Sequence, residues 1–207
     1  MKETNYTHNY LKTYLFIKGF AIGKQYNNTL KALALSMRSH ENQKRKSGEP
    51  YIIHPLRVCS QLISVGIYDD VTLASALLHD TFEDCGVNEH EVVDICKIDK
   101  EVSNIVALLT KQKGISEEVY YQKIKENPKA LIVKLSDRCN NISTMQPFSL
   151  DKMQEYINET NEYIIPLCKY GKSYYPEYSN AITVLKNHTL SICETVQSFL
   201  DYIQNKK

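Results

Sequence analysis

Apolar residues recur along most of this chain at the three- and four-residue spacing of amphipathic helices. In segment 28–40 the stripe runs from Leu30 to Met37, behind an N-cap at Asn28 or Thr29. By the same criterion we expect helices at residues 9–22, 28–40, 55–65, 71–82, 88–97, 102–109, from 116, 130–144, 157–167 and 177–205. The sequence therefore predicts an all-α fold, and the low content of glycine and proline, seven and six residues, also favours long helices.

Segment 130–144 begins with an apolar run that, by propensity, could also form a buried strand. The helical interpretation places Asp137, Asn141 and Thr144 at i, i+4 and i+7, on one face. We therefore expect a helix whose polar face needs partners. A hydrogen-bond ladder to a neighbouring helix would supply them without any functional role.

The apolar pattern ends abruptly in segment 71–82, where His79 and Asp80 are followed by Glu83 and Asp84. In a continuous helix, at about 100° per residue, these four side chains share an arc of about 140°. Burying them at the end of an apolar helix costs several kcal/mol each unless they are paired or bind a metal. Two interpretations follow: a structural ion-pair cluster, or a metal site beside carboxylates that handle protons.

Composition restricts the class of protein. The 207 residues suffice for one domain, residues 1–207, and 43% hydrophobic with 24% charged residues is an ordinary globular mixture. A net charge of +1 gives no bulk attraction to nucleic acid or to an anionic membrane. The six scattered cysteines, without a Cys-x-x-Cys pair, indicate free thiols in a reducing cytoplasm. No apolar run approaches the roughly 18 residues of a membrane span, and no signal-peptide pattern is found.

Two polar features allow either a purely structural or a functional interpretation. The loop 41–50 carries Lys44-Arg45-Lys46, and such a run is most often solvated surface, although a loop arginine can bind phosphate or stack on a base. His54 precedes Pro55 at a predicted helix start. A lone histidine there is more often a cap or a partner for a neighbouring group than a metal ligand.

The C-terminal segment 177–205 repeats apolar residues in alternating 4-3 spacing, which can form a coiled-coil seam. Leu190, Cys193 and Leu200 widen the stripe, so we expect it to pack on the chain's own core instead. The residues expected to pack in this way are Ile182, Leu185, Ile192, Val196 and Phe199.

Three blocks taken together resemble the HD-domain hydrolases of the RelA/SpoT family, specifically the stand-alone small alarmone hydrolases. They are residues 45–55 (RKSGEPYIIHP), 76–84 (ALLHDTFED) and 135–144 (LSDRCNNIST). His-Asp alone would be a weak signal, but the order and spacing of the three blocks fit, over about residues 30–170. The resemblance implies a single helical bundle around one divalent ion, commonly manganese. It also implies removal of the 3′-pyrophosphate from (p)ppGpp, giving GDP or GTP.

Position by position, the resemblance assigns roles to ten residues. The matching metal ligands are His54, His79, Asp80 and Asp137, and the matching acidic pair that positions or activates water is Glu83 and Asp84. The matching nucleotide contacts are Arg45, Lys46, Asn141 and Thr144. Two imidazoles and two carboxylates suit Mn²⁺ or Fe²⁺ better than a closed structural zinc site. They leave coordination positions open for water and a phosphate oxygen.

The chain departs from the family pattern at Ser136, at Cys139-Asn140 and in an N-terminal extension, residues 1–28. We expect none of these departures to touch a presumed ligand. The core with the motifs is expected at residues 29–170, and we expect no room for the family's synthetase module.

Two alternatives to (p)ppGpp hydrolysis stay open. The chain could hydrolyse another nucleotide such as (p)ppApp or NADPH, because base recognition depends on the shape of the pocket. It could also be a nucleotide-binding module without turnover, although the intact ligand set with Glu83 and Asp84 argues against this. A small nucleotide is the only partner expected, and the sequence sets no expectation for the oligomeric state.

Overall fold

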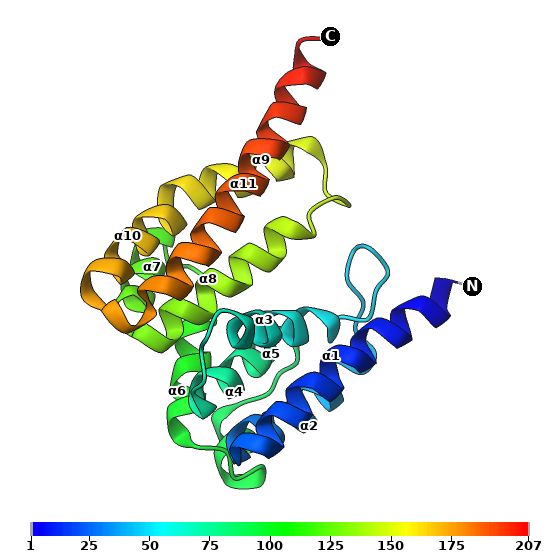
Figure 1. Cartoon of the computed structure of the whole chain (residues 1–207), viewed down its shortest axis with the longest axis vertical. Coiled ribbons are helices and arrows are strands. Elements are labelled where there is room, and N and C mark those ends of the chain that lie inside the picture. Colours follow the sequence, from blue (N-terminus) through cyan, green and yellow to red (C-terminus); the bar gives the residue numbers. More distant parts are fainter. Residues whose placement is uncertain (1, 207) are drawn as a thin grey trace.

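A computed structural model describes the backbone of residues 2–206 and the side chains of residues 10–206. All regular elements in this part of the chain are helices, which confirms the all-α expectation (Figure 1). They are α1 (Lys2–Lys24), α2 (Asn27–Ser39), α3 (Ile53–Ser64), α4 (Asp70–Leu78), α5 (Thr81–Asp84), η1 (His90–Ile95), α6 (Lys100–Leu109), α7 (Glu117–Lys125), α8 (Pro128–Ser143), α9 (Leu150–Glu159), η2 (Thr160–Ile164), α10 (Ile165–Tyr174), η3 (Pro176–Tyr178) and α11 (Ser179–Gln204). Of the short elements, η1 and η2 are π-helices and η3 is a 3₁₀-helix.

Helices α4 and α8 form the centre of the molecule. Every residue of α4 from Thr72 to Leu78 is buried, as its nearly all-round apolar sequence predicts. Helices α2 and α3 pack on α4, while α3, α6, α7 and α11 pack on α8. Segment 130–144 is helical as predicted, because α8 covers Pro128–Ser143 with Asn127 as its N-cap. The two helices that carry the second and third sequence blocks therefore lie against each other in the main core.

The N-terminus of α2 is capped by another helix. Asp70, the first residue of α4, accepts hydrogen bonds from the backbone N–H groups of Asn28 (3.0 Å) and Thr29 (2.7 Å). The Thr29 hydroxyl donates to the same carboxylate at 2.7 Å. The expectation of an N-cap at Asn28 or Thr29 is therefore wrong, since both lie inside the first turn of α2. A carboxylate at a helix N-terminus also interacts favourably with the helix dipole, so Asp70 fixes α2 on α4.

The prediction of one continuous helix over residues 71–82 is wrong at His79 and Asp80. Helix α4 ends at Leu78, and α5 begins at Thr81. His79 Nδ1 lies 2.8 Å from the carbonyl oxygen of Ala76, and the Thr81 hydroxyl donates to that of Leu78 at 2.7 Å. These side chains bond to carbonyl oxygens that would otherwise accept hydrogen bonds from backbone N–H groups, and the helix is interrupted there. Helix α5 then ends before Gly86, whose φ of +69° is the left-handed conformation expected at a helix stop.

Two further local expectations need correction. Segment 88–97 forms the π-helix η1 rather than an ordinary helix. The sequence also predicts a break at Gly171 together with Pro176, but Gly171 lies inside α10 and is buried. A Cβ atom there would lie 2.8 Å from Ile182 Cδ1 and 3.0 Å from Leu131 Cδ2. Glycine is therefore needed for close packing of α10 on α8 and α11, and the break comes at Pro176.

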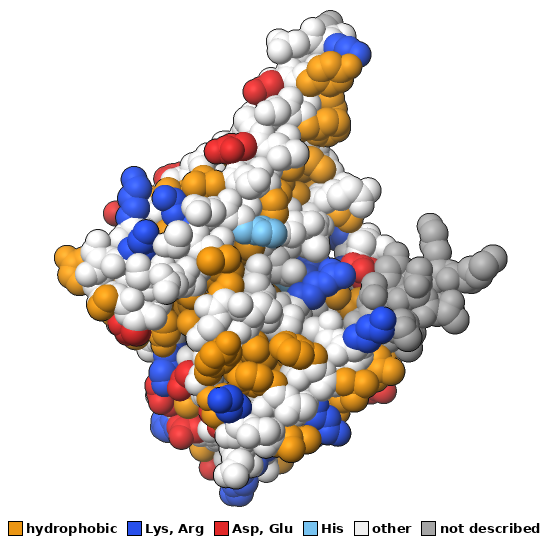
Figure 2. All heavy atoms as spheres, in the orientation of Figure 1, with side chains coloured by type: hydrophobic (Ala, Val, Ile, Leu, Met, Phe, Trp, Pro, Cys, Tyr) orange, Lys and Arg blue, Asp and Glu red, His pale blue; other side chains and the backbone are white. Residues whose placement is uncertain are grey.

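Helix α11 is packed along its first half and projects beyond the body in its last turns (Figure 1). Ile182 and Leu185 are buried in the main core, as predicted. Ile192 and Val196 are partly buried against a second, smaller apolar cluster, but Phe199 is 50% exposed, so its predicted burial is wrong. Figure 2 shows hydrophobic side chains along the projecting end. The smaller cluster consists of Ile142, Met145, Met153, Ile157, Cys193 and Leu200.

The remaining expectations concern the whole chain. All six cysteines are free, and four of them are buried. Within residues 2–206, no helix has the length and hydropathy needed to cross a membrane. The N-terminal segment forms the long helix α1, which packs on α2 and α3 rather than standing apart from the bundle.

Candidate metal centre and nucleotide cavity

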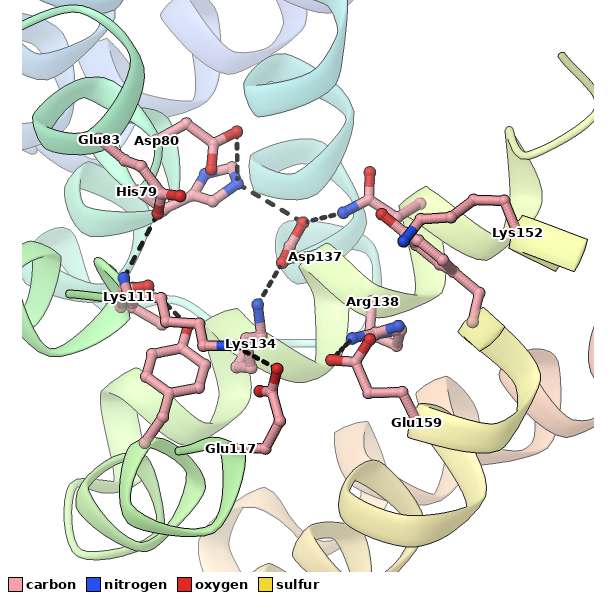
Figure 3. A pocket seen from close by; sticks show the side chains of 14 residues that line it. His79, Asp80, Glu83, Lys111, Glu117, Lys134, Asp137, Arg138, Lys152 and Glu159 are labelled. Carbon is pink, nitrogen blue, oxygen red and sulfur yellow. Dashed lines mark hydrogen bonds and ion pairs between the residues drawn. The ribbon is translucent and has the colours of Figure 1, made fainter. Parts of the chain in front are cut away.

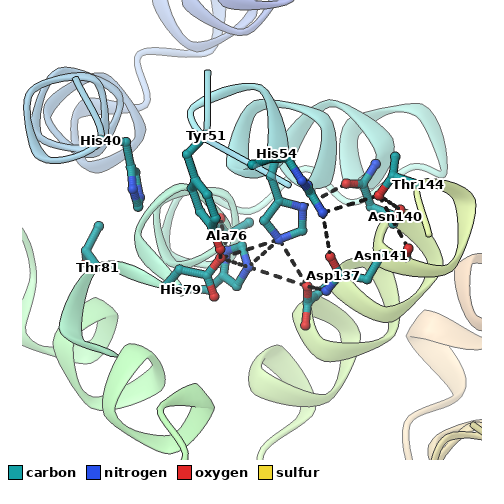
Figure 4. Close-up of polar contacts among 12 residues, drawn as sticks. His40, Tyr51, His54, Ala76, His79, Thr81, Asp137, Asn140, Asn141 and Thr144 are labelled. Atoms are coloured by element: carbon teal, nitrogen blue, oxygen red, sulfur yellow. Dashed lines mark hydrogen bonds and ion pairs between the residues drawn. The ribbon is translucent and has the colours of Figure 1, made fainter. Parts of the chain in front are cut away.

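Four side chains from three separate segments converge in the core (Figure 4). His54 lies in the first turn of α3, His79 and Asp80 link α4 to α5, and Asp137 lies in the middle of α8. The Nε2 atoms of the two imidazoles are 3.1 Å apart. Asp80 Oδ2 lies 3.4 Å from His54 Nε2 and 3.2 Å from His79 Nε2, and Asp137 Oδ1 lies 3.1 and 3.6 Å from the same atoms. The predicted convergence of these four residues is therefore observed, whereas their role as ligands is taken up below as a proposal.

Both imidazoles are oriented by their outer nitrogen atoms. His79 Nδ1 lies 2.8 Å from the Ala76 carbonyl oxygen, and His54 Nδ1 lies 2.7 Å from Asn140 Oδ1. An oxygen acceptor at this distance favours the tautomer with the proton on Nδ1. In the neutral form both imidazoles then direct an Nε2 lone pair toward each other and the two carboxylates, an arrangement that a cation between them would stabilise.

The electrostatics of the cluster also favour a positive charge. Burial alone would lower the pKa of His79, but the carboxylates of Asp80 and Asp137 outweigh it and raise this pKa to about 10. Burial would raise the pKa of Asp137, but Lys134 and the two imidazoles hold it well below its usual range. The Asp137 carboxylate is thus ionised while buried, which is costly without a cation. Ligand atoms of His54, His79 and Asp80 lie within 4.8 Å of one another, so the residues present fit a divalent ion.

The first of two cavities beside the cluster opens toward the loop 41–50. Its volume is about 350 Å³, and its wall includes Arg45, Lys46, Asn141 and Thr144. Arg45 Nη2 donates to Asn141 Oδ1 at 3.0 Å and to Thr144 Oγ1 at 3.2 Å. Lys46 Nζ lies 5.0 Å from the centre of the Phe148 ring. The four residues that the resemblance matches to nucleotide contacts therefore line one cavity, and Asp80 and Asp137 line it too.

The second cavity, of about 470 Å³, adjoins the first, and Asp80, Lys134 and Asp137 line both (Figure 3). Its basic lining residues are Lys111, Lys134, Arg138 and Lys152. Lys134 Nζ lies 2.9 Å from Asp137 Oδ2. Sequence reasoning missed this basic wall: Lys134 and Arg138 flank Asp137 on α8, which was a usable signal, whereas Lys111 and Lys152 stand in segments without any motif.

The acidic pair lies on α5, directly after the cluster. Glu83 lines the second cavity, and its Oε2 accepts a hydrogen bond of 3.3 Å from the backbone N–H of Lys111. Asp84 is exposed and lies on a different side of α5, where its charge helps to raise the pKa of Cys85 behind the larger effect of burial. Neither carboxylate forms an ion pair with a lysine or arginine among the described residues, so simple charge pairing does not explain them.

One departure from the family pattern touches the cluster after all. Asn140, at a position where the resemblance leads one to expect histidine, holds His54 Nδ1 through its side-chain oxygen at 2.7 Å. The expectation that no departure contacts a presumed ligand is therefore wrong. The Ser136 hydroxyl donates to the Val58 carbonyl and to Gln61, and Cys139 accepts from Gln61, so both residues join α8 to α3.

Comparisons with known proteins agree with this arrangement. A family model described as HD domain matches residues 32–163. The chain is 37% identical over 145 residues to a guanosine-3′,5′-bis(diphosphate) 3′-pyrophosphohydrolase of Aquifex aeolicus, covering 66% of this chain and 20% of that protein. It is 34% identical over 148 residues to the GTP pyrophosphokinase rsh of Brucella melitensis, covering 66% and 19%. The match thus spans about a fifth of the length of these relatives.

A solved structure supports the fold. It is described as a metazoan ortholog of SpoT that hydrolyzes ppGpp and plays a role in starvation responses, and it matches with a TM-score of 0.65 at 20% identity. The match covers 81% of this chain and 94% of that one. The family model spans all three sequence blocks and every residue of the converging cluster, and the chain therefore belongs to the HD-domain family.

Proposed function

We propose that this protein is a metal-dependent (p)ppGpp 3′-pyrophosphohydrolase that acts in the cytoplasm and releases pyrophosphate together with GDP or GTP. The observation that carries the proposal is the convergence of two imidazoles and two carboxylates beside two adjoining cavities with basic lining residues. The similarity to a guanosine-3′,5′-bis(diphosphate) 3′-pyrophosphohydrolase supports the choice of substrate.

His54, His79, Asp80 and Asp137 are the proposed ligands of one divalent ion, for which we propose Mn²⁺. A mixed set of imidazole and carboxylate donors suits Mn²⁺ or Fe²⁺, whereas a structural zinc site would favour thiolates. When bound, such an ion polarises a phosphoryl oxygen and lowers the pKa of a bound water. The protein holds its ligands ready by the contacts of Asn140 and Ala76 with the outer imidazole nitrogens.

The first cavity is the proposed nucleoside site. The planar guanidinium of Arg45 can stack on a base or bind a phosphate, and the ammonium group of Lys46 can bind a phosphate. Asn141 offers an amide and Thr144 a hydroxyl to the sugar or base. The lysines of the second cavity supply positive charge for the phosphates of a substrate that carries several negative charges. The substrate would then span the cluster, with its 3′-pyrophosphate at the ligand side chains.

Glu83 and Asp84 are the proposed proton-handling groups. Hydrolysis adds water across the bond between the 3′ oxygen and phosphorus. The attacking water must lose a proton, and the departing 3′ oxygen must gain one. Glu83 faces the second cavity, next to the cluster, so its carboxylate can take a proton from a water placed there. Asp84, exposed one residue further, can exchange protons with solvent.

A nucleotide panel tests the proposal. The purified protein is stripped of metal, reloaded with Mn²⁺ and incubated with ppGpp, pppGpp, ppApp and NADPH. We expect pyrophosphate release from ppGpp and pppGpp, and none from the metal-free protein or from an Asp80→Asn variant. Preferential hydrolysis of ppApp or phosphate release from NADPH would replace the substrate assignment. Binding of ppGpp without any product would reject hydrolysis in favour of a nucleotide-binding module.

A further inference from the structure

Tyr51 lies where the basic loop joins α3. Its backbone N–H donates to the Gln43 carbonyl at 2.8 Å, and the neighbouring Pro50 forms a bridge with Lys44. Arg45 N–H donates to the Glu49 carbonyl at 2.8 Å within the same loop. These bonds close the loop into a rigid unit, so the position of the Tyr51 side chain is tied to that of Arg45.

The hydroxyl of Tyr51 contacts one carboxylate oxygen of Asp80, a proposed metal ligand. It donates to Asp80 Oδ2 at 2.7 Å. The same oxygen faces the Nε2 atoms of His79 at 3.2 Å and His54 at 3.4 Å, so it is the oxygen that points to the centre of the cluster. Asp80 is the most exposed side chain of the four, at 23%, and it lies in the break between α4 and α5. Without this hydrogen bond its carboxylate could rotate toward solvent.

The ring of Tyr51 is held between several groups (Figure 4). The His40 imidazole stacks on it with centroids 4.9 Å apart and an interplanar angle of 27°, and His40 is itself fixed by Gln43 Oε1 at 2.6 Å. The guanidinium of Arg45 lies 5.9 Å from the ring centre. A cation at that distance over an aromatic ring is weakly attracted to it. One side chain thus contacts both the metal cluster and the residue proposed to bind the nucleotide.

We propose that Tyr51 is a positioning residue that couples the two halves of the site. Its hydroxyl orients Asp80 for the metal, and its ring orients Arg45 for the nucleotide. The first half rests only on the metal cluster, whereas the second also rests on the proposed function. The two roles use different parts of one side chain, so substitutions can separate them.

Tyr51→Phe tests the hydroxyl, because it keeps the ring and removes the donor to Asp80. The affinity for Mn²⁺ alone is measured by electron paramagnetic resonance or calorimetry on metal-stripped protein. Loss of an outer-shell partner typically weakens metal binding by about 10–100-fold, and we expect this range. Tyr175→Phe is the matched control, since it removes a hydroxyl that donates to the Lys125 carbonyl at 2.9 Å, outside the site. Wild-type affinity in Tyr51→Phe, or an equal loss in the control, would overturn the role.

Tyr51→Met tests the ring, with KM for ppGpp measured at saturating Mn²⁺. We expect KM to rise about two- to five-fold above that of Tyr51→Phe, as the loss of a cation–π contact predicts. Arg45→Ala should then raise KM less in the Tyr51→Met background than in the wild type. Equal KM values in the two Tyr51 variants, or full additivity with Arg45→Ala, would reject coupling through the ring. If the wild type hydrolyses no nucleotide, the proposed function fails, and the Mn²⁺ titration still decides the role of the hydroxyl.

Discussion

Arg138, the residue after Asp137 on α8, holds one wall of the second cavity, and its removal has a predictable cost. It is only 5% exposed. Its Nη2 forms an ion pair with Glu159 and donates to the Tyr121 hydroxyl at 3.2 Å. The guanidinium also lies 4.9 Å from the centre of the Tyr156 ring. Arg138 thereby joins α8 to α7 and α9, and Arg138→Met breaks all three contacts while keeping most of the buried volume.

The size of the loss follows from these contacts. A hydrogen bond to a charged group contributes about 1.5–3 kcal/mol, and a cation–π contact about 0.5–2 kcal/mol. Breaking a fully buried ion pair would cost about 3–5 kcal/mol, but the Glu159 side chain is 29% exposed and can recruit water. We therefore expect a loss of about 2–4 kcal/mol. For a chain of this length that lowers Tm by roughly 4–16 °C.

The assay is thermal unfolding of the metal-free protein, with Lys129→Met as the control. Lys129 pairs with Glu101 at 2.9 Å and Asp69 at 3.5 Å near the surface, so its loss should cost about 1 kcal/mol or less. If Arg138→Met melts within about 2 °C of the wild type, or no lower than Lys129→Met, the energetic reasoning is wrong.

The same ion pair predicts a pH dependence. Burial would raise the pKa of Glu159, but Arg138 outweighs it and lowers this pKa below its ordinary value. A carboxylate whose pKa is lowered by folding stabilises the protein fully above its unfolded-state pKa, which is about 4.3 for glutamate. This stabilisation is lost as the pH falls through the folded-state pKa. The difference in Tm between wild type and Glu159→Gln should therefore be full at neutral pH and shrink below about pH 4. A difference that stays constant or grows in acid would contradict this assignment.

Three other predictions follow from the site and the C-terminal helix. Glu83→Gln and Asp84→Asn should each keep Mn²⁺ binding and Tm but lose about 10²–10⁴ in kcat; wild-type kcat in both would remove them from the mechanism. Arg45→Ala should mainly raise KM for ppGpp, because it removes binding made before the chemical step; an unchanged KM would count against its role. In urea unfolding, Leu200→Ala should cost about 2–5 kcal/mol, whereas Phe199→Ser should stay within about 0.5 kcal/mol. Similar losses at both positions would show that Phe199 is covered in solution.

The helices and the convergence of the cluster could be predicted because they depend on local pattern and on motif order. Apolar periodicity is enough to identify α8 as a helix, and with it the shared face of Asp137 and Asn141. The break after Leu78 could not be predicted, since it depends on His79 and Thr81 side chains competing for backbone carbonyls.

Contacts between segments far apart in the sequence could not be predicted from local sequence patterns. Asp70 caps a helix that begins more than forty residues earlier, and Asn140 orients His54 across two helices. The lysines of the second cavity meet only after folding, and in the sequence they look like solvated charges. Phe199 is half exposed although the next residue, Leu200, is buried, so its exposure depends on which face of α11 the smaller cluster covers and not on its own sequence context.

The smaller apolar cluster has a consequence for how a nucleotide enters. The four proposed metal ligands stand on α3, on α8 and between α4 and α5, in the region of the main core. Phe148 and Tyr156 of the first cavity instead pack on the smaller cluster. Regions with few buried apolar contacts open locally at a lower free energy than the rest of a protein. We therefore expect the part of the first-cavity wall that Phe148 and Tyr156 form to open at a lower free energy than the main core. Entry of the proposed nucleotide substrate then need not disturb the four proposed metal ligands.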